Sequence, residues 1–176
     1  MAAIDLSAGG STNQFLSFVL NKEPYALDIS RVREVLEYQP ITRIPRTPEF
    51  FSGILNLRGS AIPVVDLRRK FGMGPTEKTV NTCIIIVEVI WENESIVLGA
   101  LADSVREVFE LLPEQIVPAP RMGTHIRPEY LAGMGRMQDH FIMVLNVDTL
   151  FSGEELAMVQ AAGLEPPPPP PANEAG

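Results

Sequence analysis

The chain of 176 residues has a single cysteine, Cys83, so no disulfide can form within it. Cys83 lies in the apolar run 83–87, where we expect a buried thiol with no reactive role. The N-terminus lacks a charged segment followed by an apolar one, and every apolar run is well short of the roughly 20 residues that a membrane span needs. These absences predict a soluble, cytoplasmic protein without direct membrane insertion.

Catalytic groups are scarce as well. The two histidines, His125 and His140, have no cysteine or carboxylate at the spacing of a metal site. The stretch 72–74, Gly-Met-Gly, is not followed by the residues of a phosphate-binding loop. Asp66 and Asp103 are expected to end strands or cap turns, without a catalytic role. We therefore predict a protein that is not an enzyme and that holds no metal or cofactor.

Basic residues are few in the second half of the chain. Residues 1–80 have ten Lys/Arg against eight Asp/Glu, whereas residues 81–176 have four against fourteen, so the two parts carry formal charges of +2 and −10. The resulting net charge of −8 argues against a nucleic-acid backbone as the partner. The asymmetry favours different partners for the two halves.

A duplication organises the residues that are present. The segment 48–71 reads as a turn, a strand, a tight turn and a second strand, which is a hairpin with Arg58 at its tip. A degenerate copy follows 80 positions downstream, where Gln138 takes the place of Arg58. Upstream of the hairpin, the motif Val-Arg-Glu-Val at 32–35 recurs at 105–108, at an offset of 73. The chain therefore consists of two related halves.

The two halves, about 14–80 and 81–151, predict the architecture. Each half would be only marginally stable alone, so we expect a shared core or close packing. Short strands separated by Gly and Pro, with little helix, favour an all-β fold of two small barrels with about five strands each. A capping box from Ser152 to Glu155 predicts one short C-terminal helix that ends at Gly163.

Both ends of the chain are expected to be disordered. Residues 1–13 are small and polar, without periodicity. Residues 164–176 contain six consecutive prolines, which favour an extended polyproline stretch. We interpret this tail as a solubilising spacer, with a ligand for a proline-binding groove as the alternative.

Several motifs together resemble a known family. They are Asp28-Ile29-x-x-Val32-x-Glu34-Val35, Ile44-Pro45 with Pro48, Gly53-x-x-Asn56-Leu57-Arg58-Gly59-x-x-Ile62-Pro63-Val64-Val65-Asp66-Leu67-Arg68, Ala102-Asp103-x-Val105-x-x-Val108, Pro118-x-Pro120 and Tyr130-Leu131-x-Gly133. Across about residues 14–160 the chain resembles the CheW-like family of bacterial chemotaxis coupling proteins. The Asn-Leu-Arg-Gly hairpin tip is a highly specific part of this resemblance.

The resemblance implies two five-stranded, SH3-like barrels that lie in tandem and share an interface. It also implies a non-catalytic adaptor that joins the cytoplasmic tips of methyl-accepting chemotaxis receptors to the histidine kinase CheA. The regulatory domain of that kinase is itself a homologous pair of barrels, and family members alternate with it in rings. We therefore expect a protein that helps to assemble receptor–kinase arrays at the inner face of the membrane.

Residue by residue, the resemblance implies two contact sites. The receptor-binding groove would comprise Val32, Glu34, Gly53, Arg58, Gly59, Val105 and Val108. The contact with the kinase or ring would comprise Pro118, Pro120, Arg121 and Met122. Val117 and Met122 depart from close relatives, which have an arginine and a phenylalanine at these positions. Judged from the residues alone, Arg58 also fits a solvated turn, the glycines fit backbone requirements, and the valines fit a core.

Three other interpretations compete with this one. A detached kinase regulatory domain, or a coupling protein fused to a receiver, would share the barrels but needs a further domain for which this chain has no room. A small barrel that binds nucleic acid is the alternative from a different class. It would need a basic face studded with aromatic residues, and this acidic chain has few aromatics between Gly72 and Met137.

Overall fold

The computed structural model describes residues 13–119 and 126–164, which form mostly β-strands. The strands are β1 (Gln14–Leu20), β2 (Glu23–Asp28), β3 (Val32–Glu37), β4 (Phe51–Leu57), β5 (Ser60–Asp66), β6 (Cys83–Trp91), β7 (Glu94–Ala102), β8 (Ser104–Glu110), β9 (Ile116–Val117), β10 (Leu131–Arg136) and β11 (Phe141–Leu145). The helical elements are α1 (Leu67–Lys70), α2 (Gly153–Leu164) and the 3-10 turns η1 (Ile29–Arg31), η2 (Pro113–Gln115), η3 (Pro128–Tyr130) and η4 (Val147–Thr149). The predicted all-β class with one short C-terminal helix is confirmed. Apart from residues 13 and 164, the ends predicted to be disordered lie outside the described residues.

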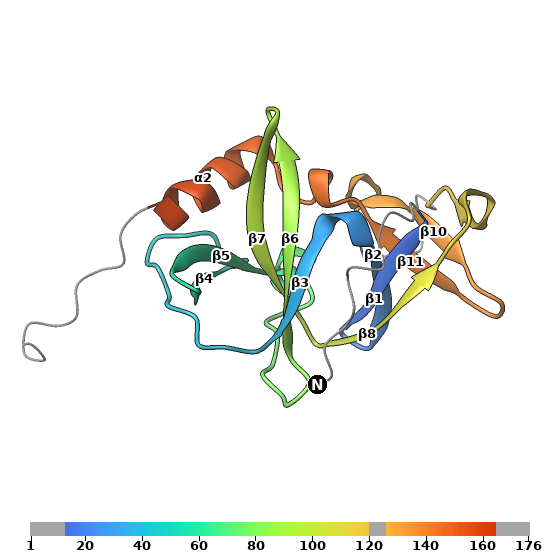
Figure 1. The fold of residues 1–176 in the computed structure, drawn as a ribbon, viewed down its shortest axis with the longest axis horizontal. Helices are drawn as coiled ribbons and strands as arrows, with labels where there is room; N and C mark the ends of the chain where they lie inside the picture. The colour runs from blue at the N-terminus through green and yellow to red at the C-terminus, as the bar shows by residue number, and fades with distance from the viewer. Residues whose placement is uncertain (1–12, 120–125, 165–176) are drawn as a thin grey trace, which may run out of the picture.

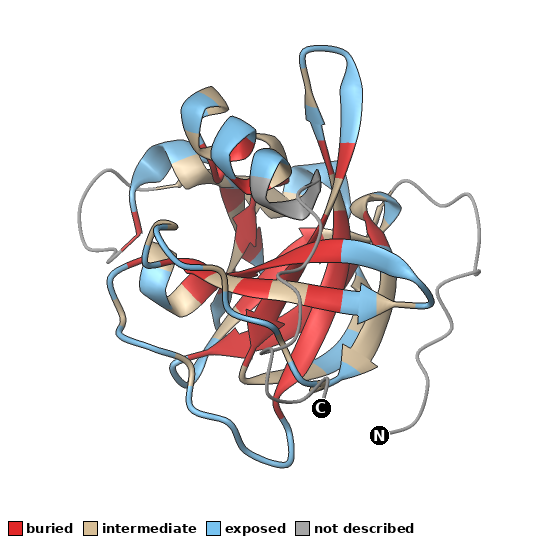
Figure 2. Cartoon of the chain, turned by 90° about the vertical axis from the view of Figure 1, so that its left-hand side faces the viewer, coloured by how far each residue is buried: buried red, intermediate tan, exposed pale blue. Residues whose placement is uncertain are grey.

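The strands form two curled sheets (Figure 1). One has six strands in the order β8-β1-β2-β11-β10-β9, and the other has five in the order β3-β6-β7-β5-β4. One large cluster of buried side chains draws on both sheets, with Leu16 and Phe18 from the first and Ile85 and Leu98 from the second. Figure 2 shows the buried residues gathered in the strands, whereas hairpin tips and loops are exposed. The two sheets therefore share a large central core, and each also has a smaller buried cluster of its own.

The two sequence halves do not coincide with the two sheets. The β1–β2 hairpin of the first half lies between β8 and β11 of the second, and the β6–β7 hairpin of the second half lies between β3 and β5 of the first. Under the repeat, β3, β4 and β5 correspond to β8, β10 and β11, and the two exchanged hairpins correspond to each other. The two strand orders are therefore equivalent. The expected barrels of residues 14–80 and 81–151 are corrected accordingly, because each barrel contains one hairpin of the other half.

A short segment after β3 and another after β8 close the two sheets into barrels. Thr42 pairs with Ile54 of β4 through backbone hydrogen bonds of 2.9 and 2.8 Å. In the other sheet, β9 pairs with β10. A glycine lies at each place where such a segment approaches its partner strand. A Cβ on Gly53 would lie 2.2 Å from the carbonyl oxygen of Thr42, and a Cβ on Gly133 would lie 2.8 Å from the carbonyl oxygen of Val117. Both glycines therefore serve the close approach of two backbones.

Two ion pairs hold the exchanged hairpins at the junction of the sheets. The guanidinium of Arg31 donates to both carboxylate oxygens of Asp148, at 2.7 and 2.6 Å. Arg68 donates to Asp103 at 3.3 Å, and Asp103 also accepts from the Asn21 N–H at 2.7 Å. Asp103 thus caps the β1–β2 turn, as the sequence analysis expected. Arg68 and Asp148 occupy equivalent positions of the repeat, 80 residues apart. The same position therefore supplies the cation of one ion pair and the anion of the other.

The C-terminal helix begins at the predicted capping box. The Ser152 N–H donates to Oε1 of Glu155 at 2.8 Å, and the Glu155 N–H donates to Oγ of Ser152 at 3.0 Å. Glu155 also pairs with Lys70 at 2.7 Å, and this largely buried ammonium lies 5.0 to 5.5 Å from the centroids of three rings, those of Phe50, Tyr130 and Phe151. These contacts hold α2 against the rest of the fold. Within the described residues, neither helix is long and apolar enough to cross a membrane.

Candidate protein-binding surfaces

The β4–β5 hairpin ends in a two-residue turn formed by Arg58 and Gly59. Their φ angles are 51° and 87°, in the left-handed region that matches the twist of a two-residue hairpin. The Gly59 N–H donates to Oδ1 of Asn56 at 3.0 Å, so the asparagine stabilises the turn with its own side chain. The turn presents the Arg58 side chain to solvent, where it is 70% exposed.

Arg58 meets a carboxylate of the same chain. Its Nη2 lies 2.6 Å from Oε2 of Glu34 in β3. Since β3 and β4 stand at opposite ends of the strand order, only the curling of the sheet brings this pair together. An exposed ion pair of this kind contributes about 0 to 1 kcal/mol to stability. A carboxylate of a binding partner can therefore replace Glu34 at little cost.

The valines that the resemblance assigns to the receptor groove pack toward the core. Val32 is buried, and Val105 and Val108 are half-buried against the same large cluster. Residues three apart in a regular strand point to opposite faces. In β8, however, Ser17 of β1 faces two residues at once, and this bulge allows both valines to lie on one side. The Ser17 hydroxyl accepts from the Glu107 N–H at 3.2 Å and donates to its carbonyl at 3.1 Å, which satisfies the backbone of the bulge.

The residues expected in the receptor groove thus fall into two kinds. Those at the surface or partly exposed are Glu34, Arg58 and Gly59. Those wholly or partly packed inside are Val32, Gly53, Val105 and Val108. Only the first kind forms a continuous polar site, because the ion pair joins β3 to the hairpin tip. Gly53 lies beneath the Thr42 backbone, so its role is to allow the barrel to close.

Most of the segment expected to contact the kinase lies outside the described residues. This applies to Pro120, Arg121 and Met122, whereas Pro118 is described and exposed. Val117, one of the two departures from the family pattern, is half-buried in β9 and pairs with Met134. The segment therefore begins at a strand that helps to close the second barrel.

The carboxylate of Asp66 is fully engaged in structure. It caps α1 by accepting from the backbone N–H groups of Arg68 and Arg69, at 3.1 and 3.4 Å. Thr76 donates its N–H and its hydroxyl to the same carboxylate, at 2.9 and 2.6 Å. Asp66 therefore ends a strand and caps a turn, as the sequence predicted, and it anchors the loop that follows α1.

The other groups weighed for chemistry are also structural or exposed. Cys83 is buried, and burial raises the pKa of its thiol. His140 lies at the surface with its Nδ1 2.7 Å from Oδ1 of Asp139, and His125 lies outside the described residues. Within residues 13–119 and 126–164, no three His, Cys, Asp or Glu side chains are close enough to hold a metal ion.

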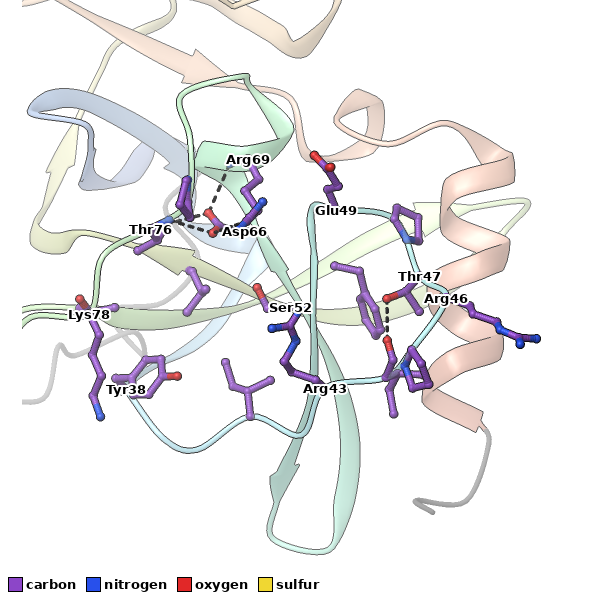
Figure 3. A pocket seen from close by; sticks show the side chains of 18 residues that line it. Tyr38, Arg43, Arg46, Thr47, Glu49, Ser52, Asp66, Arg69, Thr76 and Lys78 are labelled. Atoms are coloured by element: carbon purple, nitrogen blue, oxygen red, sulfur yellow. Dashed lines mark hydrogen bonds and ion pairs between the residues drawn. The ribbon is translucent and has the colours of Figure 1, made fainter.

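The structure also contains a basic groove that no sequence motif predicted. It has a volume of about 790 Å³ and lies where β3, β5 and β7 end and β4 and β6 begin (Figure 3). Its cationic lining residues are Arg43, Arg46, Arg69 and Lys78. Arg43 and Arg46 come from the segment between β3 and β4, Arg69 comes from α1, and Lys78 comes from the loop after α1, so no local motif contains them. The positive charge of the first half was the one signal that pointed to such a surface.

Comparison with known proteins agrees with this architecture. A family model described as "CheW-like domain" matches residues 14–155. The chemotaxis protein CheW of Klebsiella aerogenes is 36% identical over 160 residues, which cover 90% of this chain and 94% of that protein. The protein of the same name from Rhizobium meliloti is 29% identical over 154 residues, covering 88% and 96%. A crystal structure described as the scaffolding protein TtCheW from Thermoanaerobacter tengcongensis has a TM-score of 0.73 at 36% identity and covers 85% of this chain and 94% of that one. The chain therefore belongs to the CheW-like family of non-catalytic chemotaxis scaffold proteins, as its motifs predicted.

Proposed function

We propose that this protein couples the cytoplasmic tips of chemoreceptors to the histidine kinase CheA and helps to assemble receptor–kinase arrays. The proposal places it in the cytoplasm, at the inner face of the membrane where the receptor tips lie. Family membership supports the general role of a chemotaxis scaffold. The identity of the two partners is the part that the proposal adds.

The observation that carries the receptor contact is the exposed Arg58 at the β4–β5 tip. Among residues 13–119 and 126–164, Glu34 alone pairs with its side chain, while the equivalent tip of the duplicated hairpin carries Gln138. The scaffold therefore does not need an arginine at this position. A planar guanidinium that can form two parallel hydrogen bonds with a carboxylate suits the capture of a receptor side chain. In the proposal Val105 and Val108 supply apolar contact beside it.

The kinase contact is proposed for the segment from Pro118 to Met122, which would meet the regulatory domain of CheA. Exposed Pro118 follows directly on β9, so the first residue of the segment is supported by the β9–β10 pairing. The strongly acidic second half and the weakly basic first half are in keeping with two different partners.

The test is reconstitution with purified CheA and a soluble signalling fragment of a chemoreceptor. We expect the three proteins to sediment together, and CheA autophosphorylation to respond to the receptor only when this chain is present. Binding to CheA alone would support the kinase half of the proposal and contradict the receptor half. Binding to neither protein would contradict both.

A further inference from the structure

The cations around the basic groove have few partners of their own. Within the described residues, Arg43, Arg46 and Lys78 form no hydrogen bond or ion pair, and the Nζ of Lys78 lies over the face of Tyr38, 4.7 Å from the ring centroid. Arg69 lies 3.9 Å from Asp66, whose oxygens are already engaged by Thr76 and by backbone N–H groups. Glu49 also lines the groove, so the four cations outnumber two lining carboxylates, those of Glu49 and Asp66. The groove thus carries an excess of positive charge in a protein of net charge −8.

The duplication shows that the fold does not need three of these cations, Arg43, Arg46 and Arg69. At the offset of 73, Arg43 and Arg46 correspond to Ile116 and Ala119, and at the offset of 80, Arg69 corresponds to Thr149. The second barrel closes in the same way with these uncharged residues in place. The positive charge of the first barrel is therefore available for a role other than folding.

The shape of the groove distinguishes among anionic ligands. Apolar lining residues accompany the cations, and these are Ile41, Ile44, Phe51 and Leu101. In Figure 3 the charged ends of Arg43, Arg69 and Lys78 stand apart around the groove, and the side chain of Arg46 points away from it. A compact anion such as phosphate would need its cations to converge on one point. Separated cations with apolar side chains between polar ones suit a longer ligand that carries several carboxylates and at least one apolar side chain.

We propose that this groove binds an acidic peptide segment of a partner protein. Carboxylates of the segment pair with Arg43, Arg69 and Lys78, and an apolar side chain enters between Ile44 and Phe51. This surface is distinct from the Arg58 site and from the segment after Pro118. The inference therefore stands independently of the receptor and kinase contacts proposed above.

Fluorescence anisotropy with a labelled synthetic peptide of alternating glutamate and leucine tests the inference. We expect the acidic peptide to bind the full chain, to bind more weakly as salt is added, and to outcompete a lysine–leucine peptide of equal length. The double variant Arg43→Gln/Lys78→Gln should lose at least about tenfold in affinity, since each 1.4 kcal/mol of lost interaction corresponds to a factor of ten. The exposed Arg136 of β10 provides a matched control, and Arg136→Gln should bind like the wild type.

Several outcomes would overturn the inference. Equal binding of both peptides, or equal losses in the groove and control variants, would mean that the attraction is not located in the groove. Inorganic phosphate that competes as well as the peptide would make this a site for small anions. A thymidine oligonucleotide that binds more tightly than the peptide would assign the groove to nucleic acid. If a chain that ends at Gly163 binds the peptide more tightly than the full chain does, the natural occupant of the groove would be the protein's own tail, residues 164–176. Equal melting temperatures of all variants are required for each comparison.

Discussion

Arg58 and Glu34 form an ion pair between a hairpin tip and an edge strand, with Nη2 of the arginine 2.6 Å from Oε2 of the glutamate. The arginine remains 70% exposed, so the pair positions a guanidinium at the surface without burying it. Because solvent screens such a pair, it adds little to stability. Its value lies in holding a long, flexible side chain close to one orientation.

This arrangement predicts that Arg58→Ala separates binding from stability. The free energy of unfolding should change by no more than about 0.5 kcal/mol, as for an ordinary surface substitution. Receptor-dependent control of the kinase should be largely lost. The control is Gln138→Ala at the equivalent tip, which should leave both properties unchanged. The charge exchange Arg58→Glu/Glu34→Arg sharpens the test, because it retains the ion pair but moves the guanidinium, and coupling should still fail. Normal coupling in that variant would mean that only the internal pair matters.

Gly53→Ala should destabilise the protein by at least about 1 to 3 kcal/mol, because its Cβ would lie 2.2 Å from the Thr42 oxygen at a φ of 143°. Gly72 is the matched control, since its φ of 75° is also positive but no atom lies within 4 Å of an added Cβ. Gly72→Ala should cost only about 1 kcal/mol. Chemical denaturation of both variants measures the difference. Equal losses would show that backbone conformation, and not the crossing of the chains, explains Gly53.

Val108→Met should weaken receptor binding while lowering the free energy of unfolding by less than about 1 kcal/mol, since the half-buried side chain has room to extend outward. Val64 of β5 is fully buried and provides the comparison. Val64→Met should cost about 1 to 3 kcal/mol through overpacking. Denaturation curves together with a receptor pull-down test this. A large stability loss in Val108→Met would assign the residue to the core alone.

Asp148→Asn should make the stability of the protein less dependent on pH. Hydrogen bonds from Arg31 hold the pKa of Asp148 below its ordinary value, and the Ile90 N–H acts in the same direction. A lowered folded-state pKa stabilises the fold above the unfolded value of about 3.9 and loses that effect as the pH falls through the folded-state value. The variant should be on the order of 1 to 3 kcal/mol less stable at pH 7. The gap should narrow below about pH 4. A gap that stays constant down to pH 3 would contradict this account.

Removing residues 164–176 should leave folding and kinase coupling intact. The segment has six prolines and, apart from Leu164, no large apolar residue to bury, and the buried Leu156 and Val159 of α2 would remain. Thermal melting and the reconstituted kinase assay check both parts. A lower melting temperature or lost kinase binding would refute the interpretation of the tail as a spacer.

Local chemistry explains which elements the sequence could predict. The β4–β5 hairpin and its copy were readable because turn residues stand between apolar runs, and the Ser152–Glu155 box marked the start of α2. These features depend on residues within a few positions of each other. The sequence also placed Arg58 at an exposed tip. It could not show that Arg58 pairs with Glu34 of β3, which lies 24 positions earlier in the chain.

By itself, the sequence determined the duplication, the hairpins, the capped helix and the membership of the family. Each of these depends on residues close together in the sequence or on residues that recur at a fixed offset. Only the tertiary structure decided that the two halves exchange hairpins. Barrels with and without the exchange would bury the same apolar faces, since the β1–β2 and β6–β7 hairpins are equivalent under the repeat. The choice rests on contacts between distant segments, the parallel pairings of β2 with β11 and of β5 with β7 and the ties from Arg31 to Asp148 and from Arg68 to Asp103. The basic groove has the same origin, because its loops are adjacent only once the barrel has closed.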